Sequence, residues 1–452
     1  MRTLFEISRS GLRHMQRSLS VTSNNVINAE TPGYSRQRAI SSPAGNQLTG
    51  YHIGLGVNAT EVQRLRDELN DQILSDKQHS MGFMEQKMSH LQRLEAAMTS
   101  DSGSDLDVRL SKFFDSFSDL SSSPQDMSMR NAVASEAVQL THKLHEMSRS
   151  NDRTGELAQD SARSNIEEIN GLLRDIHTLN ESIRRGEAKG QGDYSSLDLR
   201  VAKMEELSRL VGFESQVSGL DSMEIRINGI LVVDETSWHE LKPEFRTGSE
   251  EMHVRLANGK NVHVTEGALG ADLEMINDQI PNFRIELDQL AETVVQEVNQ
   301  VHISGYGLED DQQRHFFDPT RTTASGIQVR DEILQNHEHI AASTESETAG
   351  NGELAIEMAS LRDKALFGHR KIGDQAVQMI AGPGREIHQL EAQMESRESE
   401  IQMLKNQQEQ VAGVNLDEEL AMLIQYQNAY QGAARMMTAA QDTYDTLIAM
   451  LR

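Results

Sequence analysis

Apolar residues recur every three or four positions over most of the chain, which is the pattern of helices that bury one face. The pattern predicts helices over residues 5–31, 62–98, 105–121, 125–186, 196–211, 271–302, 353–411 and 415–451. Pro32 and Gly33 end the first helix, because proline disfavours helical geometry in the preceding residue and glycine accepts positive φ. Proline in a helix interior also predicts an interruption of the seventh helix at Gly382-Pro383-Gly384.

Two stretches change from this period to an alternating pattern. Residues 224–233 and 253–264 each alternate apolar and polar positions, and each has Asn-Gly in its middle. Asn-Gly between alternating runs is a strong hairpin signal. The sequence therefore predicts a small β-rich domain over residues 213–268, which contains the single tryptophan, Trp238. Residues 34–60, rich in Gly, Ser, Pro and Asn, predict an extended, irregular connection.

These elements define a mainly α protein with a small β insertion, in which helices of the N- and C-terminal halves form a long-helix bundle. Three parts are expected. The first is a terminal helical coiled-coil domain, residues 1–33 plus 413–452. The second is a long-helix core, residues 34–212 plus 269–412. The third is the β-rich insertion, residues 213–268.

The two terminal helices carry the most regular apolar stripes. The N-terminal stripe contains Phe5, Leu12, Met15, Leu19 and Val26. The C-terminal stripe contains Leu416, Leu420, Leu423, Tyr430, Met437, Tyr444, Ile448 and Leu451. Burial of one seam does not offset the entropy of ordering a lone helix, so each stripe needs a partner.

Charge suggests that the two terminal helices are partners for each other. Residues 1–66 carry eight arginines and three glutamates, a net charge of +5, while residues 416–452 carry five acids and two arginines, a net charge of −3. Opposite charges favour packing of one helix on the other. Periodicity alone leaves a second interpretation open, in which both stripes belong to the core of one monomer.

Composition narrows the class of protein. The formal net charge of −27 repels nucleic acid and anionic lipid, so neither nucleic-acid binding nor membrane insertion is expected. The chain has no cysteine, which excludes thiol catalysis, thiolate metal sites and disulfides. We expect no cleavable signal peptide, because the N-terminus has no apolar run of the required length. Seven prolines in 452 residues leave room for very long helices.

The sequence offers no catalytic, cofactor-binding or metal site. His142 and His145 share a helix face, and His337 and His339 are two residues apart, but no third ligand has matching spacing. No phosphate-binding loop or nucleophile elbow is present. The pattern favours a helical structural or interaction protein over an enzyme.

Two motifs go beyond periodicity. Residues 23–37, Ser-Asn-Asn-Val-Ile-Asn-Ala-Glu-Thr-Pro-Gly-Tyr-Ser-Arg-Gln, resemble the N-terminal signature of flagellar axial proteins, and the Ser-Arg-Gln tail is most similar to that of the hook-associated protein 1 family. Its characteristic residues, which we expect to serve assembly together with the N-terminal stripe, are Asn24, Asn25, Asn28, Thr31, Pro32, Gly33 and Tyr34.

The second motif lies at the other end of the chain. Residues 413–420, Gly-Val-Asn-Leu-Asp-Glu-Glu-Leu, and residues 426–431, Tyr-Gln-Asn-Ala-Tyr-Gln, resemble the C-terminal signature of the same family. Residues 290–302 are similar to its central helix. The order along the chain also agrees. Relatives often carry an additional outer domain, and we expect that domain to be absent or reduced here.

The resemblance implies a structural part of the bacterial flagellum at the junction between hook and filament. It implies that the terminal helices form a coiled-coil-like inner layer and that β domains face outward. It also implies secretion through the flagellar type III system, with an export chaperone that holds the C-terminal helix and its stripe. The implied neighbours are further copies of the chain, the hook protein and the second junction protein, hook-associated protein 3.

Two other functions remain to be weighed. Another axial part, such as hook or distal rod protein, would share both end motifs but would have mostly β sequence between them. The predicted helices over 62–98 and 125–186 argue against it. An enzyme on a helical scaffold would need a constellation of catalytic residues that the sequence does not provide.

Overall fold

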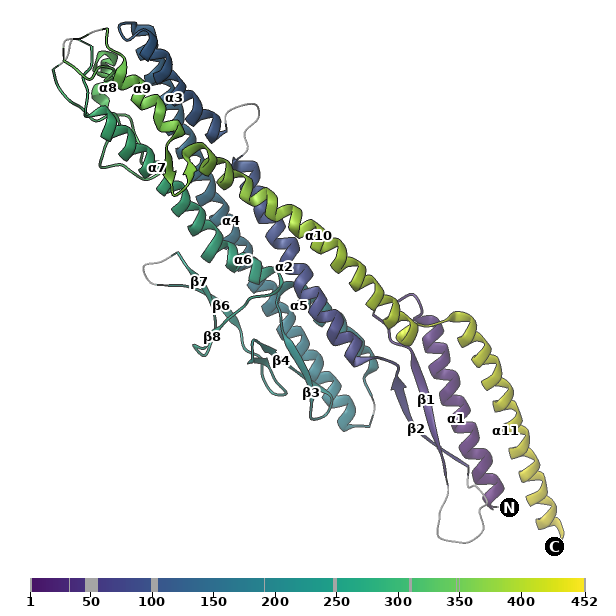
Figure 1. Cartoon of the computed structure of the whole chain (residues 1–452). Helices are drawn as coiled ribbons and strands as arrows, with labels where there is room; N and C mark the ends of the chain where they lie inside the picture. The colour runs from purple at the N-terminus through teal and green to yellow at the C-terminus, as the bar shows by residue number, and fades with distance from the viewer. Residues whose placement is uncertain are drawn as a thin grey trace. The chain divides into compact units, whose positions relative to one another are not determined.

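The computed structural model describes residues 2–450 except Pro32, 45–55, 99–104, Gln191, 247–249, 309–310, Glu347 and Ala349. Figure 1 shows the order of its elements. The principal helices are α1 (Arg2–Ile27), α2 (Glu68–Met98), α3 (Leu106–Ser122), α4 (Met127–Ala188), α5 (Tyr194–Leu210), α6 (Gly267–Glu274), α7 (Ile280–His302), α8 (Asp331–Gln335), α9 (Glu353–Ser360), α10 (Ile372–Ala412) and α11 (Leu416–Met450).

The strands are short, and among the described residues they form four small antiparallel sheets. They are β1 (Gln37–Pro43), β2 (Val57–Arg64), β3 (Glu214–Ser218), β4 (Ser222–Ile227), β5 (Ile230–Val233), β6 (Leu241–Phe245), β7 (Met252–Leu256), β8 (Asn261–Val262), β9 (Ala365–Phe367) and β10 (Arg370–Lys371). The mainly α fold with a small β insertion is therefore confirmed.

The chain divides into two compact units. Unit 1 contains Met1–Ser80, Ile169–Glu240 and Arg397–Arg452, and unit 2 contains Met81–Glu168 and Leu241–Ser396. The three-stranded sheet β3–β4–β5 falls in unit 1, and the sheet β6–β7–β8 falls in unit 2. The three parts expected from the sequence are layers of an assembled structure, not compact units of a single chain, and they stay a prediction.

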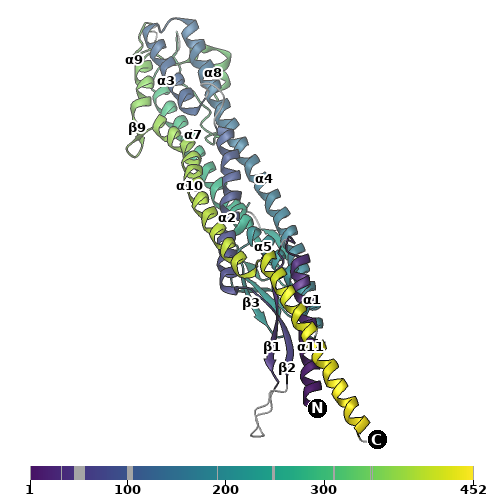
Figure 2. The ribbon, with the colours of Figure 1, turned by 90° about the vertical axis from the view of Figure 1, so that its right-hand side faces the viewer.

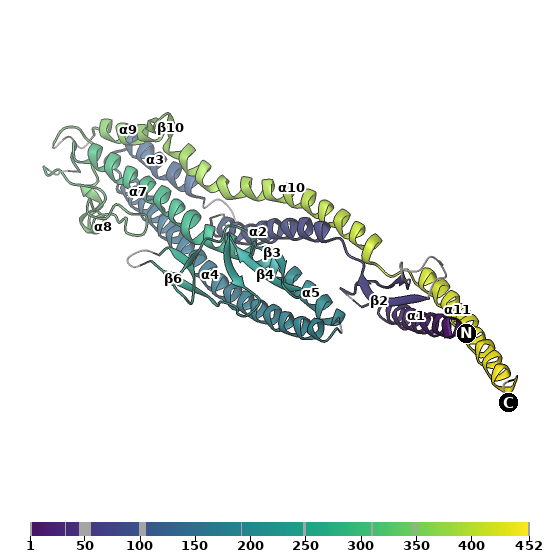
Figure 3. The same ribbon diagram turned by 90° about the horizontal axis from the view of Figure 1, so that it is seen from below.

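Unit 1 holds both terminal helices side by side, as the three views agree (Figures 1, 2 and 3). The two helices are antiparallel, because Asn25 bonds Glu419 and a Cβ on Gly11 would lie 4.0 Å from the Ala433 Cβ. The β1–β2 pair also packs on α1. Gly56, at φ +99°, lets this pair approach α1 so closely that a side chain there would meet Ser10.

Elsewhere in unit 1, a hairpin turn and a helix start have the residues that their backbone conformation favours. Asn228 and Gly229 both have positive φ, 47° and 73°, which is the conformation of a type I′ hairpin turn between β4 and β5. Asp193 begins α5 as its N-cap, since its carboxylate accepts from the Ser196 N–H. Trp238 forms an isolated antiparallel β-bridge with Val233 beside this sheet.

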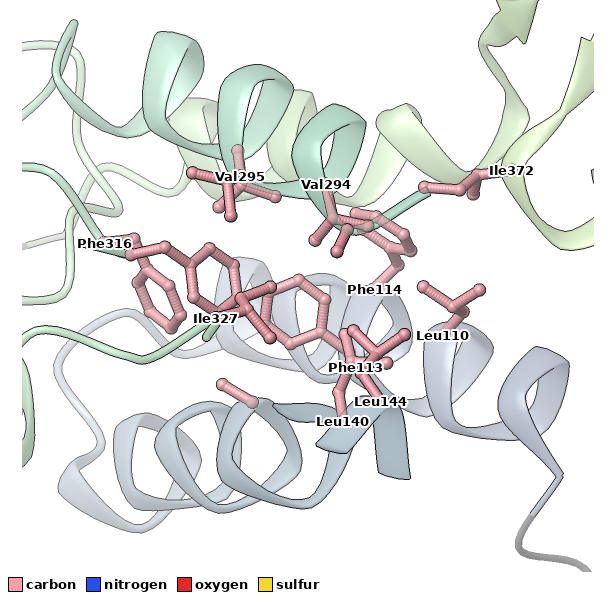
Figure 4. Close-up of a cluster of buried hydrophobic side chains, with 14 of the residues drawn as sticks. Leu110, Phe113, Phe114, Leu140, Leu144, Val294, Val295, Phe316, Ile327 and Ile372 are labelled. Atoms are coloured by element: carbon pink, nitrogen blue, oxygen red, sulfur yellow. The ribbon is translucent and has the colours of Figure 1, made fainter. Parts of the chain in front are cut away.

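Unit 2 has one large apolar core (Figure 4). Five phenylalanines from α3 and from the loop after α7 form a ring cluster at its centre, and the rings in contact have centroids 5.0–5.9 Å apart. They are Phe113, Phe114, Phe117, Phe316 and Phe317. Aromatic rings at these separations pack favourably, so the cluster stabilises unit 2. It contains a large share of the few aromatic residues in the chain.

Four expectations about elements need correction. Residues 34–60 are not irregular throughout: β1 and β2 pair from Gln37 with Arg64 to Pro43 with Val57, and the register shifts once, between Ile40 and Ser41. The second helix begins at Glu68 rather than at residue 62, because residues 57–64 belong to β2. At its start Leu74 is buried, whereas the neighbouring apolar residues Leu69 and Ile73 are exposed.

The other two corrections concern the region before the last helix. Pro383 lies inside the continuous α10, because Met379, Ile387 and Leu390 are buried on either side of it and hold the helix in place. The break falls earlier, at the small β9–β10 pair. Its turn residue Gly368 has φ +64°, a conformation that glycine adopts readily.

The unfolding free energy of unit 2 should depend on pH through His302. This imidazole is fully buried: its Nδ1–H donates to the Arg314 carbonyl at 2.6 Å, and its Nε2 accepts from the Ala341 N–H at 2.9 Å. Burial lowers the pKa of His302 to about 4. The unfolded chain binds a proton near pH 6.5, so between about 6.5 and 4 only the unfolded state gains that proton.

We therefore expect the free energy of unfolding to be highest above pH 6.5 and to fall as the pH drops towards 4, by on the order of 3 kcal/mol from this group. Urea titrations followed by circular dichroism, at several pH values, measure it. His302→Gln should lose this part of the slope, and the exposed His388→Gln should keep it. Equal slopes in His302→Gln and the parent would contradict the assignment.

Candidate functional site

The two end motifs meet in unit 1 around one buried amide. Asn25 sits near the end of α1, and all four of its hydrogen-bonding positions are used. Its Nδ2 donates to the Gln37 carbonyl at 2.9 Å and to Glu419 Oε2 at 3.0 Å. Its Oδ1 accepts from the Gln37 N–H at 3.0 Å and from the Tyr34 hydroxyl at 2.8 Å. One side chain thus links α1, β1 and α11.

Glu419 is the C-terminal half of this site. Its carboxylate is buried, and it accepts from Asn25 and from Arg36 Nε at 2.8 Å. Arg36 also reaches Glu418, at 3.2 Å, and its backbone N–H donates to the Ala412 carbonyl. A buried carboxylate is tolerated only when paired and hydrogen-bonded, and its place in the first turns of α11 is favoured by the helix dipole. We call Asn25, Tyr34, Arg36, Gln37 and Glu419 the terminal latch.

Tyr34 belongs to the latch as a donor. Burial and the nearby Asp198 carboxylate raise the pKa of Tyr34 to about 12, so its hydroxyl stays protonated at ordinary pH. Asn24 Nδ2 donates to this hydroxyl at 3.2 Å, and Asn28 Nδ2 donates to Asn24 Oδ1 at 3.0 Å. Thr31 Oγ1 lies 3.4 Å from Asn28 Oδ1 and continues the chain of hydrogen bonds.

The turn that brings Tyr34 back onto α1 depends on Gly33, which has φ +77°. Ser35 is buried beyond it, and its hydroxyl accepts from Arg64 at 3.2 Å and from Arg66 at 3.3 Å. Arg64 pairs in turn with Asp198 on α5, at 2.5 Å. The turn is therefore held on both sides by polar contacts.

Of the motif residues expected in the site, the structure brings together Asn24, Asn25, Asn28, Thr31 and Tyr34. Pro32 and Leu451 lie outside the described residues. Ser35, Arg36, Gln37 and Glu419 were not among the expected site residues. They stand inside the two quoted motifs, and the opposite charges of Arg36 and Glu419 were the signal that could have paired them.

The apolar stripes are only partly covered in the single chain. On α1, Leu12, Met15, Leu19 and Val26 are half-buried and Phe5 is exposed. On α11, Leu423 and Met437 are half-buried against α1, whereas the remaining described members are exposed: Leu416, Leu420, Tyr430, Tyr444 and Ile448. Ile424, which the expected stripe missed, is exposed as well. The α11 stripe therefore divides into a part that meets α1 and a part that meets solvent.

A cavity of about 230 Å³ opens beside the latch, lined by Arg36 and by residues of α1, β1 and α11 that include Ser18, Glu419 and Tyr426. The described residues contain no cluster of three acidic or histidine side chains placed to hold a metal ion. Nor does any described helix combine the length and the apolarity needed to cross a bilayer.

A helical chain whose ends are tied together by the two axial signatures belongs to the class of flagellar axial proteins. The C-terminal part agrees: residues 407–450 match the family described as flagellar basal body rod FlgEFG protein C-terminal. Residues 91–317, half of the chain, match the flagellar hook-associated protein FlgK helical domain. The chain belongs to the FlgK family of flagellar hook-associated proteins.

Individual relatives agree over the full length. Flagellar hook-associated protein 1 of Bacillus subtilis is 24% identical over 98% of this chain and 97% of its own length. The protein of the same name from Salmonella typhimurium is 23% identical over 99% of this chain and 100% of its own. The flagellar hook junction protein FlgK from Burkholderia pseudomallei has the same fold, with a TM-score of 0.66 and 12% identity over 76% of this chain and 100% of that chain.

The resemblance seen in the sequence is thereby confirmed. The chain is a structural component of the bacterial flagellum, and it acts outside the cell at the hook–filament junction. The helical match over residues 91–317 agrees with the argument from the long helices against hook or rod protein.

Proposed function

We propose that α1 and α11, tied together by the terminal latch, are the surface through which this subunit joins the flagellar axis. The observation that carries the proposal is the combination of a satisfied polar latch with exposed apolar side chains on the same two helices. Latch residues need no partner beyond the chain itself. Leu416, Leu420 and Ile424 are exposed one helical turn apart, and a surface of that kind gains free energy when another chain covers it.

In this proposal the parts of the chain form layers of the junction. Residues 1–33 plus 413–452 form the inner, coiled-coil-like layer. Residues 34–212 plus 269–412 form the helical layer around it, and residues 213–268 face outward. Support comes from unit 1, where the terminal helices pack on each other and on β1–β2. The role is structural, and we infer that the chain is not an enzyme.

The partners follow from the same surface. Further copies of the chain, the hook protein and hook-associated protein 3 would contact the exposed faces of the terminal helices in the finished junction. Before type III export, a helical chaperone would cover α11, laying its own apolar groove along the exposed residues. Family membership supports these partners as a class, since hook-associated proteins assemble with hook components.

Leu420→Asp tests the assembly surface. The side chain is 48% exposed in the single chain, so the substitution should change the free energy of unfolding by no more than about 0.5 kcal/mol. In an assembled junction the same position would bury an unpaired carboxylate, which is costly. We expect secreted, folded subunit but few or no filaments when the variant replaces the parent in cells, counted by electron microscopy.

Gln425→Asp is the matched control, because Gln425 is exposed on the same helix away from Leu420 and Ile424. It should support normal filaments. A normal filament count with Leu420→Asp would show that this face of α11 is not buried in the junction.

A further inference from the structure

Two exposed arginines on α1 and two exposed aspartates on α11 form no ion pair with another described residue of the chain. On α1, Arg9 and Arg13 are exposed one turn apart, and Phe5 is exposed one turn before them. Neither arginine forms an ion pair with another described residue. This face of α1 points away from α11, whose contact with α1 runs past Gly11 and Asn25.

On α11 the matching groups lie near the C-terminal end. Asp442 and Asp445 are exposed and form no ion pair with another described residue. Tyr444 and Ile448, beside them, are 57% and 41% exposed. The acids of α11 therefore differ: Glu419 is buried and paired, while Asp442 and Asp445 are exposed and form no ion pair with another described residue.

These groups cannot meet within one chain. Glu419 lies opposite Asn25, and Ala433 lies opposite Gly11, so Asp442 is level with the start of α1. Arg9 and Asp445 are then offset by about ten residues, which is roughly 15 Å along the helix axis. The side chains of Arg9 and Asp445 cannot span that distance, so the partner of each must come from a second chain.

A second copy of this chain fits the two faces in one antiparallel register. When Arg9 is placed opposite Asp445, Arg13 comes within one residue of the position opposite Asp442, and Phe5 within one residue of the position opposite Ile448. Both ion pairs and the apolar contact then form at once. Oppositely charged faces of this kind select and orient partners more than they add affinity.

We propose that the C-terminal part of α11 packs on the exposed face of α1 of the next copy, through Arg9–Asp445, Arg13–Asp442 and Phe5–Ile448. The contact is heterologous, because different faces of the two copies meet. It therefore propagates along a ring or helix of subunits instead of closing a dimer. The inference rests on the proposed assembly role of the terminal helices and names the partner surface.

Cross-linking tests the register, and the absence of cysteine makes the full chain a clean background. In the proposed register Gln16 lies opposite Thr438, and both are exposed. A mixture of the single variants Gln16→Cys and Thr438→Cys, treated with a short bifunctional thiol reagent at high protein concentration, should give a mixed dimer. A mixture of Gln16→Cys with Gln425→Cys should not. Equal yields in the two mixtures, or no dimer, would overturn the proposal.

Charge exchange tests the pairs. In the Cys background, the double variant Arg9→Glu/Arg13→Glu should lower the mixed-dimer yield at least about tenfold when both copies carry it. Adding Asp442→Lys/Asp445→Lys to the same chains should restore the yield, because the signs are then exchanged. A yield that ignores these charges would overturn the proposal. Leu420→Asp separates the two ideas: if it abolishes filaments while the charge variants assemble normally, the assembly role stands and this register fails.

Discussion

Glu419→Leu should release α11 from α1. The leucine leaves Asn25 Nδ2 and Arg36 Nε without their buried acceptor, and removing one partner of a buried, hydrogen-bonded charge pair typically costs about 3–5 kcal/mol. We expect hydrogen exchange of α11 amides to speed up by the corresponding factor, and protease sites in residues 412–450 to become accessible. Amides of α7, in unit 2, should keep their protection.

Two matched variants test whether loss of the buried Glu419 charge causes the release of α11. Glu419→Gln keeps the shape and one acceptor oxygen but loses the charge, so its effect should be intermediate. Glu418→Gln removes the neighbouring carboxylate, which is largely exposed and pairs with Arg36 at the surface, so it should cost less than about 1 kcal/mol. Unchanged α11 protection in Glu419→Leu would mean that the apolar contacts with α1 suffice and that the latch is dispensable.

The function of the subunit should respond to the same change. In a subunit with a loose α11, the exposed faces of α1 and α11 are no longer held in a fixed relation. Each assembly step would then carry the entropy cost of ordering α11. We therefore expect Glu419→Leu to reduce filament number in cells, with secreted subunit still present. This outcome differs from that of Leu420→Asp, which leaves α11 protected in the single chain.

Elements whose signal is local could be predicted from the sequence. The long helices follow from their period, and the β4–β5 turn follows from Asn228-Gly229, because both kinds of signal depend on residues a few positions apart. Gly33 adopts the positive φ that its place in the motif indicated. The continuity of α10 through Pro383 could not be predicted, because buried residues on both sides of the proline hold the helix together.

The site was predictable only in part, for a physical reason. A stripe shows that a helix face is apolar, but it does not show what covers that face, so the exposure of Leu420 and the burial of Glu419 were equally hidden. The contact between Asn25 and Glu419 joins residues 394 positions apart. Strands β1 and β2 gave little signal because one side of the pair stays polar and exposed, which weakens the apolar alternation.

A second large effect should come from Asp272, in unit 2. This carboxylate is fully buried, and it accepts from three side chains on two other helices. Oδ1 accepts from Gln86 at 2.7 Å and from His90 Nε2 at 2.6 Å, both on α2, while Oδ2 accepts from Asn165 on α4 at 2.6 Å. One carboxylate on α6 thus connects α2 and α4 inside unit 2.

Asp272→Ala should destabilise unit 2 by about 3–5 kcal/mol, since the buried His90 and the half-buried Gln86 and Asn165 lose their acceptor at once. His90 has no other acceptor among the described residues. Its Nδ1 is buried without a partner, and its Nε2 contacts only Asp272 and the Gln86 amide. Urea titration followed by circular dichroism measures the change, and hydrogen exchange of α6 amides localises it.

Asp160→Ala is the control, because Asp160 lies on α4 with a largely exposed side chain and a surface ion pair to Arg163 that is worth less than about 1 kcal/mol. α11 should keep its protection in Asp272→Ala, since α11 belongs to unit 1. The pattern is the reverse of that expected for Glu419→Leu, so the two variants together test whether the units lose stability separately. Asp272→Ala at parental stability would mean that apolar packing holds these helices together without the carboxylate.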